Sequence, residues 1–394
     1  MKILIVAMAE SVHTSRWISQ ICDQDWDIHV FPSIDSGIAH TDLRNVTVHH
    51  SLYRSQKNSD STVKFHGIPV ISRRIEWIGK YILKKIEPNY RAIQLQRLIK
   101  KLKPDIIHSM ETQAAGYLTV NAKKSFNGSF PIWIHTVWGS DIYLFGRLKE
   151  HREKIKDVLK SCDYYISECQ RDIKLARIFG FKGDILFTSS AEGGFDLQAC
   201  SELRQMGPVS SRRIILLKGY QGWAGRSLVG LRALERCADL LEDYEIVIYV
   251  AAPEVVIAAE LFTESTGILT RIIPHGTPHQ EIMRLHGKAR LSIGLSISDG
   301  LPSSFLEALV MGAFPIQSNT SCADEWIIDG KSGFIVPPED PDIIASTIRK
   351  AISDDNLVDT AAQINEETAK NNLDFFVIRE NVIDLYTKLV TDKS

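Results

Sequence analysis

Hydrophobic residues in this chain fall into short continuous runs that are separated by polar turns and by stretches of helical periodicity. The run Ile3–Met8 leads through a polar turn into a helical stretch around Trp17, and Asp27–Phe31 then resembles a second strand. The second half repeats the pattern with the runs Ile214–Leu217 and Leu291–Ile297. Apolar runs that alternate with amphipathic helices are typical of strand-helix-strand units with a parallel sheet. The sequence therefore predicts an α/β protein throughout.

The length of the chain indicates two domains. Its 394 residues, 44% of them hydrophobic, exceed what one hydrophobic core usually serves. We expect an N-terminal domain over 1–195, a linker over 196–212, a second domain over 213–375, and a C-terminal helix over 376–394 that is a candidate to pack back on the first domain.

The charges are distributed unevenly along the chain. The net charge of -2 argues against a nucleic-acid partner. Residues 1–200 contain 28 Lys/Arg and 21 Asp/Glu, however, whereas the remainder contains 18 and 27. We therefore expect the first half to meet acidic surfaces more readily than the second.

The cysteines and the N-terminus indicate a reducing compartment. Six scattered cysteines form no C-x-x-C pair and no zinc-like spacing, so neither a disulfide framework nor a structural metal is indicated. The apolar run within Lys2–Ala9 is short and fits a buried strand better than a signal peptide. No window approaches the 18 or so apolar residues of a spanning helix. The predicted location is cytoplasmic, with peripheral contact at the inner face of the plasma membrane as a further hypothesis.

The hypothesis of membrane contact comes from a basic stretch at 73–103. It contains ten Lys/Arg against two glutamates, its apolar residues recur at helical spacing, and Trp77 and Tyr81 lie beside them, with Pro88 as an interruption. One interpretation is an amphipathic helix on an anionic membrane surface. The other, which we favour slightly, is a domain helix with a solvated charged side.

Polar residues also follow two strands of the first half. Glu10, His13 and Arg16 come after the first strand, and ligands of parallel α/β folds bind beyond the carboxyl ends of strands. The G-x-G-x-x-G fingerprint is missing there, so a nicotinamide or flavin site is not expected. A later strand contains His135 and runs into a turn with Asp141, which places both at the edge of a cleft. A lone strand histidine is, however, more often a hydrogen-bonded core residue.

A glycine-rich turn from Lys218 to Arg226 follows the strand Ile214–Leu217. Glycines between strand and helix let backbone approach an anion, and the two cations add positive charge. The pattern predicts a phosphate site, although a purely structural turn would fit as well.

The stretch Ser296–Ser318 predicts a tight turn, a helix over about 304–311 and a strand. Asp299 and Glu307 bracket its first half, so both can face the unpaired N–H groups of the helix start, where phosphate binds favourably. We interpret it as a cradle for a nucleotide diphosphate. The alternative is an ordinary capping box in which Ser304 and Glu307 only fix the helix start.

The run D-G-L-P-S-S-F-L-E-A-L-V-M-G-A-F-P-I, followed by E-W-I-I-D-G-K-S-G-F-I-V, resembles the donor-binding domain of glycosyltransferase family 4. These are retaining enzymes of the GT-B fold, in which two acidic residues are separated by seven. The resemblance covers residues 214–352 well and the first half more loosely. It implies two Rossmann-like domains with a cleft between them.

The resemblance also implies roles for individual residues. Glu307 would bind the nucleotide ribose, Asp299 would lie near the donor sugar, and Lys218 and Arg226 would neutralise the diphosphate. No metal and no cofactor are expected, because cations replace a divalent ion. The implied catalytic residues are His135, Asp141, Lys218, Arg226 and Asp299; the donor-binding residues are Gly219, Gly300, Leu301, Pro302, Ser303, Ser304, Phe305, Glu307 and His275; and the acceptor-side residues are Glu10, His13 and Arg16.

The sequence departs from the family pattern at three points. Asp299 is one methylene shorter than the usual glutamate, the two cations stand in an unusual order, and the N-terminal turn lacks the common glycine pair. The implied function is a metal-independent, retaining hexosyltransferase that uses a nucleotide-sugar donor and a glycan or lipid-linked acceptor in surface polysaccharide or glycoconjugate synthesis. A nucleotide-sugar epimerase of GT-B fold and a non-catalytic sugar-nucleotide-binding subunit are the alternatives.

Overall fold

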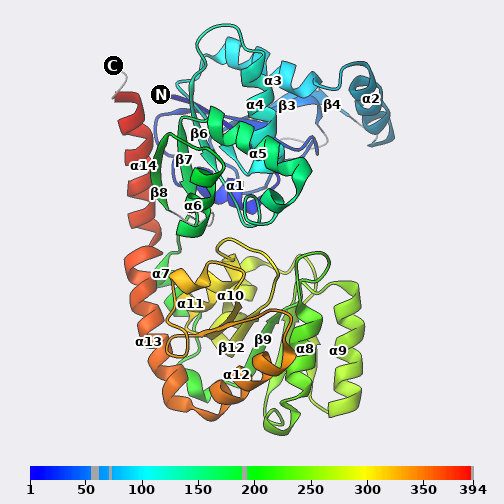
Figure 1. Ribbon diagram of the computed structural model, residues 1–394, viewed down its shortest axis with the longest axis vertical. Helices are drawn as coiled ribbons and strands as arrows, with labels where there is room; N and C mark the ends of the chain where they lie inside the picture. The colour runs from blue at the N-terminus through cyan, green and yellow to red at the C-terminus, as the bar shows by residue number, and fades with distance from the viewer. Residues whose placement is uncertain (55–61, 71–72, 189–192, 392–394) are drawn as a thin grey trace. The chain divides into compact units, whose positions relative to one another are not determined.

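A computed structural model describes residues 1–54, 62–70, 73–188 and 193–391 (Figure 1). The chain divides into two compact units, which are treated separately below. Unit 1 consists of Met1–Gly193 together with Ile378–Ser394, and unit 2 of Gly194–Val377. The last helix therefore begins in unit 2 and ends in unit 1. Of the segment predicted as the C-terminal helix, residues 392–394 lie outside the described chain.

Unit 1 is built on a sheet of eight parallel strands in the order β4-β3-β2-β1-β5-β6-β7-β8. The order reverses between β1 and β5, so the carboxyl ends of these two strands flank a topological switch point. The strands are β1 (Lys2–Ala7), β2 (Asp27–Pro32), β3 (Thr47–Arg54), β4 (Lys64–Pro69), β5 (Ile106–Met110), β6 (Ile132–Thr136), β7 (Tyr164–Ser167) and β8 (Asp184–Thr188).

Alternating residues of β1 supply the two faces of this sheet. Ile3 and Ile5 pack with α1 and α14, whereas Leu4 and Val6 pack with α3, α4 and α5. Both faces are thus buried, as a parallel sheet requires. The helices of unit 1 are α1 (Val12–Ser19), α2 (Arg73–Ile86), α3 (Tyr90–Leu102), α4 (Tyr117–Lys124), α5 (Lys149–Ser161), α6 (Gln170–Ile178) and the part of α14 (Phe375–Thr391) after Val377.

The basic stretch 73–103 forms two helices of different character. Pro88 separates α2 from α3, as the sequence indicates. Helix α3 buries Leu95 and Ile99, which fits the domain-helix interpretation. Helix α2 instead exposes Trp77 by 67% and Ile86 by 75%. None of the helices in the described parts of the chain combines the length and the apolarity needed to cross a membrane.

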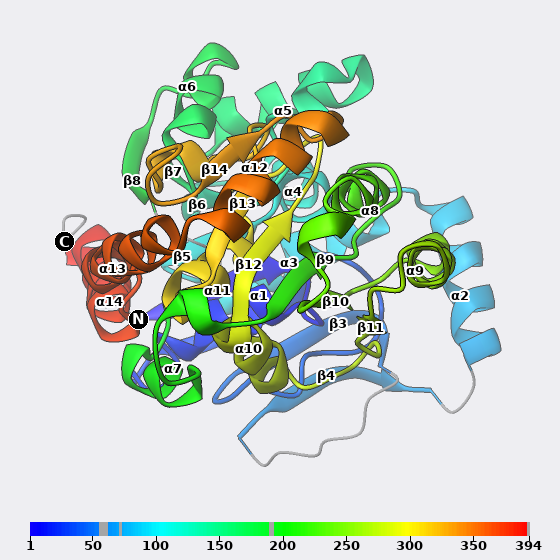
Figure 2. The ribbon, with the colours of Figure 1, turned by 90° about the horizontal axis from the view of Figure 1, so that it is seen from below.

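Unit 2 has six parallel strands in the order β11-β10-β9-β12-β13-β14, which reverses between β9 and β12. Helices α8, α9 and α12 pack on one face, and α10 and α11 pack on the other (Figure 2). The prediction of two Rossmann-like α/β domains is confirmed. The strands are β9 (Ile214–Lys218), β10 (Glu245–Tyr249), β11 (Thr270–Ile272), β12 (Ala289–Gly294), β13 (Phe314–Ser318) and β14 (Phe334–Val336); the helices are α7 (Leu197–Leu203), α8 (Ser227–Glu235), α9 (Pro253–Thr266), α10 (His279–Lys288), α11 (Ser303–Met311), α12 (Pro341–Ser353) and α13 (Asp355–Asn372).

The segment predicted as a linker, 196–212, is instead a folded part of unit 2. It forms α7 and a short 3-10 turn, and Val209 joins the hydrophobic core. The buried Arg212 guanidinium donates hydrogen bonds of 3.2 Å to the carbonyl oxygens of Ala289 and Met311. A polar residue at this position is structural because it satisfies backbone carbonyls that packing removes from water.

Candidate active site

The switch point of unit 2 joins two loops into one structural element. Ile297 N–H donates to the Ala224 carbonyl over 2.8 Å, and Arg226 N–H donates to the Leu295 carbonyl over 3.0 Å. The two loops thus form a short antiparallel bridge at the carboxyl ends of β9 and β12. The glycine-rich turn and the predicted cradle are therefore held together, where open α/β sheets bind ligands.

The glycines of the β9–α8 turn serve packing more than the close approach of an anion. A Cβ on Gly219 would lie 2.7 Å from Ala251 Cα, and one on Gly225 would lie 2.0 Å from the Tyr220 carbonyl oxygen. The Gly219 N–H already donates to the Tyr249 carbonyl over 2.8 Å. These two glycines are required because neighbouring backbone lies against them.

The two predicted phosphate cations stand in different environments. Lys218 ends β9 and is half-buried. Arg226 immediately precedes α8, and its Nε lies 2.8 Å from Oε1 of Glu339. The Glu339 side chain is mostly exposed, so this ion pair is weak and a phosphate can compete for the guanidinium.

The predicted cradle is a helix start without a side-chain cap. Helix α11 begins at Ser303 after Pro302, and no side chain caps it. Ser304 lies inside the first turn, so the capping-box interpretation is wrong. Leu301 and Phe305 turn their side chains into a hydrophobic cluster, which leaves the backbone of this segment as its polar surface. In the preceding turn, Oδ1 of Asp299 accepts a 2.9 Å hydrogen bond from the N–H of Gly300.

Glu307 is a buried carboxylate held by two histidines. It is 5% exposed, and its Oε1 lies 2.6 Å from His279 Nε2, while Oε2 lies 3.4 Å from His286 Nε2. Burial alone would raise the pKa of Glu307, but the hydrogen bonds and charges of the two histidines outweigh it and hold the pKa well below the usual value. The carboxyl group is therefore ionised at neutral pH.

Sequence reasoning missed both histidines and Tyr249. His279 and His286 are seven residues apart, which places them on one face of α10, and that spacing is the signal that could have found them. Tyr249 ends β10 with its ring 5.7 Å from that of His286; burial first, and then the charge of Glu307, raise the pKa of its hydroxyl. The exposed His275 is instead hydrogen-bonded to the Ala251 carbonyl over 2.9 Å.

In unit 1, His135 is completely buried in β6. Its Nδ1 lies 2.8 Å from the Ser109 hydroxyl and its Nε2 lies 3.1 Å from the Thr112 hydroxyl. Burial lowers the pKa of this imidazole to about 3, so the ring is neutral. Both ring nitrogens are therefore engaged, and a hydrogen bond from His135 to a sugar would require the exchange of one of these partners.

Asp141 ties together the loops that follow β5 and β6. Its Oδ2 accepts hydrogen bonds from the N–H groups of Thr112 over 2.8 Å and Trp138 over 3.0 Å. Burial, and then the nearby carboxylate of Glu111, raise the pKa of Asp141. Glu111, also missed from the sequence, has a φ of 73° and accepts from the N–H groups of the following turn. Strained backbone of this kind is frequent at functional sites.

The predicted acceptor-side residues lie at the carboxyl end of β1. Ser11 caps α1 by accepting from the His13 N–H over 3.2 Å, and the His13 ring packs 5.3 Å from that of Trp138. His13 is thereby brought next to the turn that contains Asp141. Glu10 and Arg16 flank it, before and within α1, and both are half-buried.

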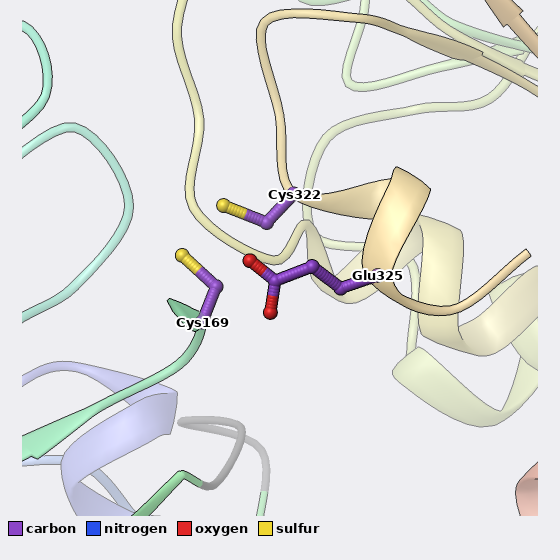
Figure 3. A group of neighbouring side chains, drawn as sticks. All are labelled: Cys169, Cys322 and Glu325. Atoms are coloured by element: carbon purple, nitrogen blue, oxygen red, sulfur yellow. The ribbon is translucent and has the colours of Figure 1, made fainter. Parts of the chain in front are cut away.

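Among the residues that the structure describes, no three potential metal ligands of one unit lie close together. All six cysteines are free. Cys322 and Glu325 stand on one turn of unit 2, whereas Cys169, also drawn in Figure 3, follows β7 of unit 1. Two such groups in one unit are fewer than the three or four protein ligands that zinc takes. The expectation that no metal takes part stays a prediction.

Two family models match the chain, one on each half. "Glycosyl transferase 4-like" matches residues 2–168, and "Glycosyl transferases group 1" matches residues 258–371. No curated protein sequence matches significantly.

Several solved structures share the fold over nearly the whole chain. Sucrose-phosphate synthase from Thermosynechococcus elongatus is 15% identical, with all of both chains covered and a TM-score of 0.69. HepE from Anabaena in complex with UDP-glucose is 13% identical over 98% of this chain and 100% of that one, with a TM-score of 0.66. Trehalose 6-phosphate synthase from Burkholderia multivorans is 12% identical over 100% and 98%, with a TM-score of 0.70.

The two domain models and the two parallel sheets together define a glycosyltransferase of the GT-B fold.

Proposed function

We propose that this protein is a retaining, metal-independent hexosyltransferase of family 4 that transfers a sugar from a nucleotide-sugar donor. Unit 2 binds the donor, and the residues around Glu10, His13 and Arg16 in unit 1 bind the acceptor. The acceptor is a glycan or a lipid-linked intermediate of surface polysaccharide or glycoconjugate synthesis.

The observation that carries this proposal is the ionised, buried Glu307, the fifth residue of α11, a helix that begins without a side-chain cap. A carboxylate accepts hydrogen bonds from the hydroxyl groups of a ribose, and the positive end of a helix dipole favours a diphosphate. Both features lie on α11, directly after the bridged loops of the switch point. A nucleoside diphosphate carries both a ribose and a diphosphate, so one such ligand would use both the carboxylate and the helix start.

The chemistry requires charge stabilisation on the leaving diphosphate. Lys218, Arg226 and the start of α11 supply positive potential, and Arg226 is released from Glu339 as the phosphate takes its place. Asp299, held by the turn at Gly300, contacts the donor sugar, and its shorter side chain selects the donor. For retention, the acceptor attacks on the face that the phosphate leaves, and a phosphate oxygen takes the acceptor's proton.

His135 and Asp141 act from within unit 1. Because both nitrogens of His135 are hydrogen-bonded internally, we assign the ring a positioning role for Ser109 and Thr112. Asp141 fixes the Trp138 N–H and thereby the wall against which His13 packs. These two groups shape the acceptor side and do not take part in proton transfer.

Helix α2 is the part of unit 1 that we propose to meet an anionic membrane from the cytoplasmic side. Its exposed Trp77, Ile82 and Ile86 would enter the interface, while Lys84 and Lys85 would pair with lipid phosphates. This contact would bring a lipid-linked acceptor to the enzyme.

A donor panel tests the proposal. UDP-, GDP- and TDP-sugars are incubated with the protein with and without candidate acceptors, and products are followed by mass spectrometry. Transfer to an acceptor with retained anomeric configuration is expected. Free epimerised sugar nucleotide would favour the epimerase, binding without turnover would favour a non-catalytic subunit, and failure of every nucleotide to bind would exclude all three functions. Since HepE was crystallised with UDP-glucose, a UDP-sugar is the first to try.

A further inference from the structure

The two histidine neighbours of Glu307 differ in their freedom to move. His279 is the first residue of α10, and its side chain is 46% exposed. His286 lies two turns further along the same helix and is completely buried. His279 can therefore leave the carboxylate by rotating into solvent, whereas His286 cannot.

Because Glu307 is buried, the loss of the His279 hydrogen bond is unfavourable unless another hydrogen-bond donor takes its place. Glu307 lies among buried groups, with the Tyr249 ring packed against His286 behind it. A buried carboxylate that loses a hydrogen-bond donor pays the desolvation penalty of the freed oxygen. A ribose hydroxyl is a donor that could take over the same oxygen.

We propose that His279 is a latch that occupies Oε1 of Glu307 until the ribose of a donor nucleotide displaces it. This inference rests on the proposed function, in which Glu307 binds ribose. In the empty protein the His279 Nε2–H donates to Oε1 over 2.6 Å. On binding, a ribose hydroxyl donates to Oε1, the imidazole turns outward, and Oε2 stays beside His286. Hydrogen bonds are exchanged, and no covalent bond changes.

The latch has opposite consequences for stability and for affinity. It stabilises the empty protein, because it satisfies a buried carboxylate. It weakens nucleotide binding, because the ligand must first displace the imidazole, so that part of its interaction with Glu307 is offset.

Removing the latch therefore gives two changes of opposite sign. In His279→Ala, we expect the melting temperature of the protein without nucleotide to fall and the Kd for the nucleotide to decrease roughly tenfold or more, as for a hydrogen bond to a charged group. UDP, GDP and TDP are titrated by calorimetry. Gln280→Ala, a neighbouring exposed position on α10, is the matched control and should change neither quantity.

The same titration separates the failure of the latch from the failure of the proposed function. If Glu307→Ala leaves nucleotide affinity unchanged, or if no nucleotide binds, the ribose role of Glu307 is wrong. If Glu307→Ala weakens nucleotide binding, the ribose role of Glu307 stands. If His279→Ala then also weakens binding, or leaves the affinity unchanged, the latch is wrong.

A spectroscopic signal reports the exchange directly. In proton–nitrogen spectra of the histidine side chains, the Nε2–H of His279 should give a hydrogen-bonded resonance in the empty protein. Saturating nucleotide should abolish it, and Glu307→Ala should abolish it without nucleotide. A resonance that persists in the nucleotide complex would overturn the proposal.

Discussion

The indole N–H of Trp17 donates a 3.0 Å hydrogen bond to the hydroxyl of Tyr386, near the other end of the chain. The same hydroxyl lies 2.5 Å from Nδ1 of His108, whose Nε2 lies 2.7 Å from the Thr136 hydroxyl. This buried chain of hydrogen bonds links α1 and α14 to β5 and β6, the strands that precede Glu111 and Asp141. Tyr386 is thus a polar centre of an otherwise apolar core.

Tyr386→Phe should lower the free energy of unfolding by about 1–3 kcal/mol, because it leaves buried groups of Trp17 and His108 without a partner. Urea unfolding measures this loss. Thr387→Ala, an exposed change on the same helix, is the control and should cost far less. An equal loss in both variants would show that the helix, and not the hydroxyl, carries the effect.

The stability contributed by Glu307 should depend on pH in a defined direction. Its pKa is lower in the folded than in the unfolded protein, so the contribution is present above the ordinary glutamate pKa of 4.5 and is lost as pH falls through the folded pKa. Glu307→Gln should therefore destabilise the protein at pH 7 by about 1–3 kcal/mol and less in acid. Chemical denaturation at pH 7, 5 and 4 compares the two proteins. A difference that grows on acidification would contradict this assignment.

Asp141 should show the opposite dependence. Because burial and Glu111 raise the pKa of Asp141 in the folded state, its contribution to stability is fully present below the ordinary aspartate pKa of 3.8 and is lost as pH rises through the raised pKa. Asp141→Asn keeps an oxygen for the N–H groups of Thr112 and Trp138 without the buried charge. The variant should gain stability relative to the parent protein as pH rises from 5 to 8.5, measured by urea unfolding. A relative loss over that interval would mean that the ionised carboxylate is the stabilising form.

Helix α2 should determine binding to anionic vesicles. Replacing Lys84 and Lys85 with Gln should weaken binding to phosphatidylserine-containing vesicles roughly tenfold or more, since each lysine near such a surface contributes about 1 kcal/mol. The matched control replaces Lys100 and Lys101 on α3, which changes the charge equally on a helix whose apolar side is buried. Vesicle sedimentation measures both. Equal effects would indicate general attraction by net charge, and no effect in either variant would remove the membrane proposal.

The sequence predicted most strands and the turns at the carboxyl ends of β9 and β12 because these depend on local patterns. Apolar runs located most of the strands, and the spacing of Asp299 and Glu307 identified the loop and helix at the switch point of unit 2. The partners of Glu307 were not predicted, since the pairing of α10 with α11 is a tertiary contact and His279 taken alone has the pattern of an ordinary surface residue.

Buried polar residues account for the other differences. Arg212 belongs to a stretch whose composition indicates a linker, yet its guanidinium satisfies two backbone carbonyls in the interior. His135 is a hydrogen-bonded core histidine, the more frequent of the two cases weighed from the sequence, and hydroxyls from β5 and the following turn occupy both its nitrogens. The partners of both residues come from elsewhere in the fold, so one strand alone does not identify them.

Because α14 belongs to both units, it determines the order in which the two units can complete their folding during synthesis. Unit 2 is one continuous segment, whereas unit 1 contains both the first 193 residues and the part of α14 from Ile378 onward. During synthesis, the core around Trp17 therefore cannot be completed before the whole of unit 2 has been made, because Tyr386 follows unit 2 in the sequence. The half of the enzyme that is made first is the half that is completed last.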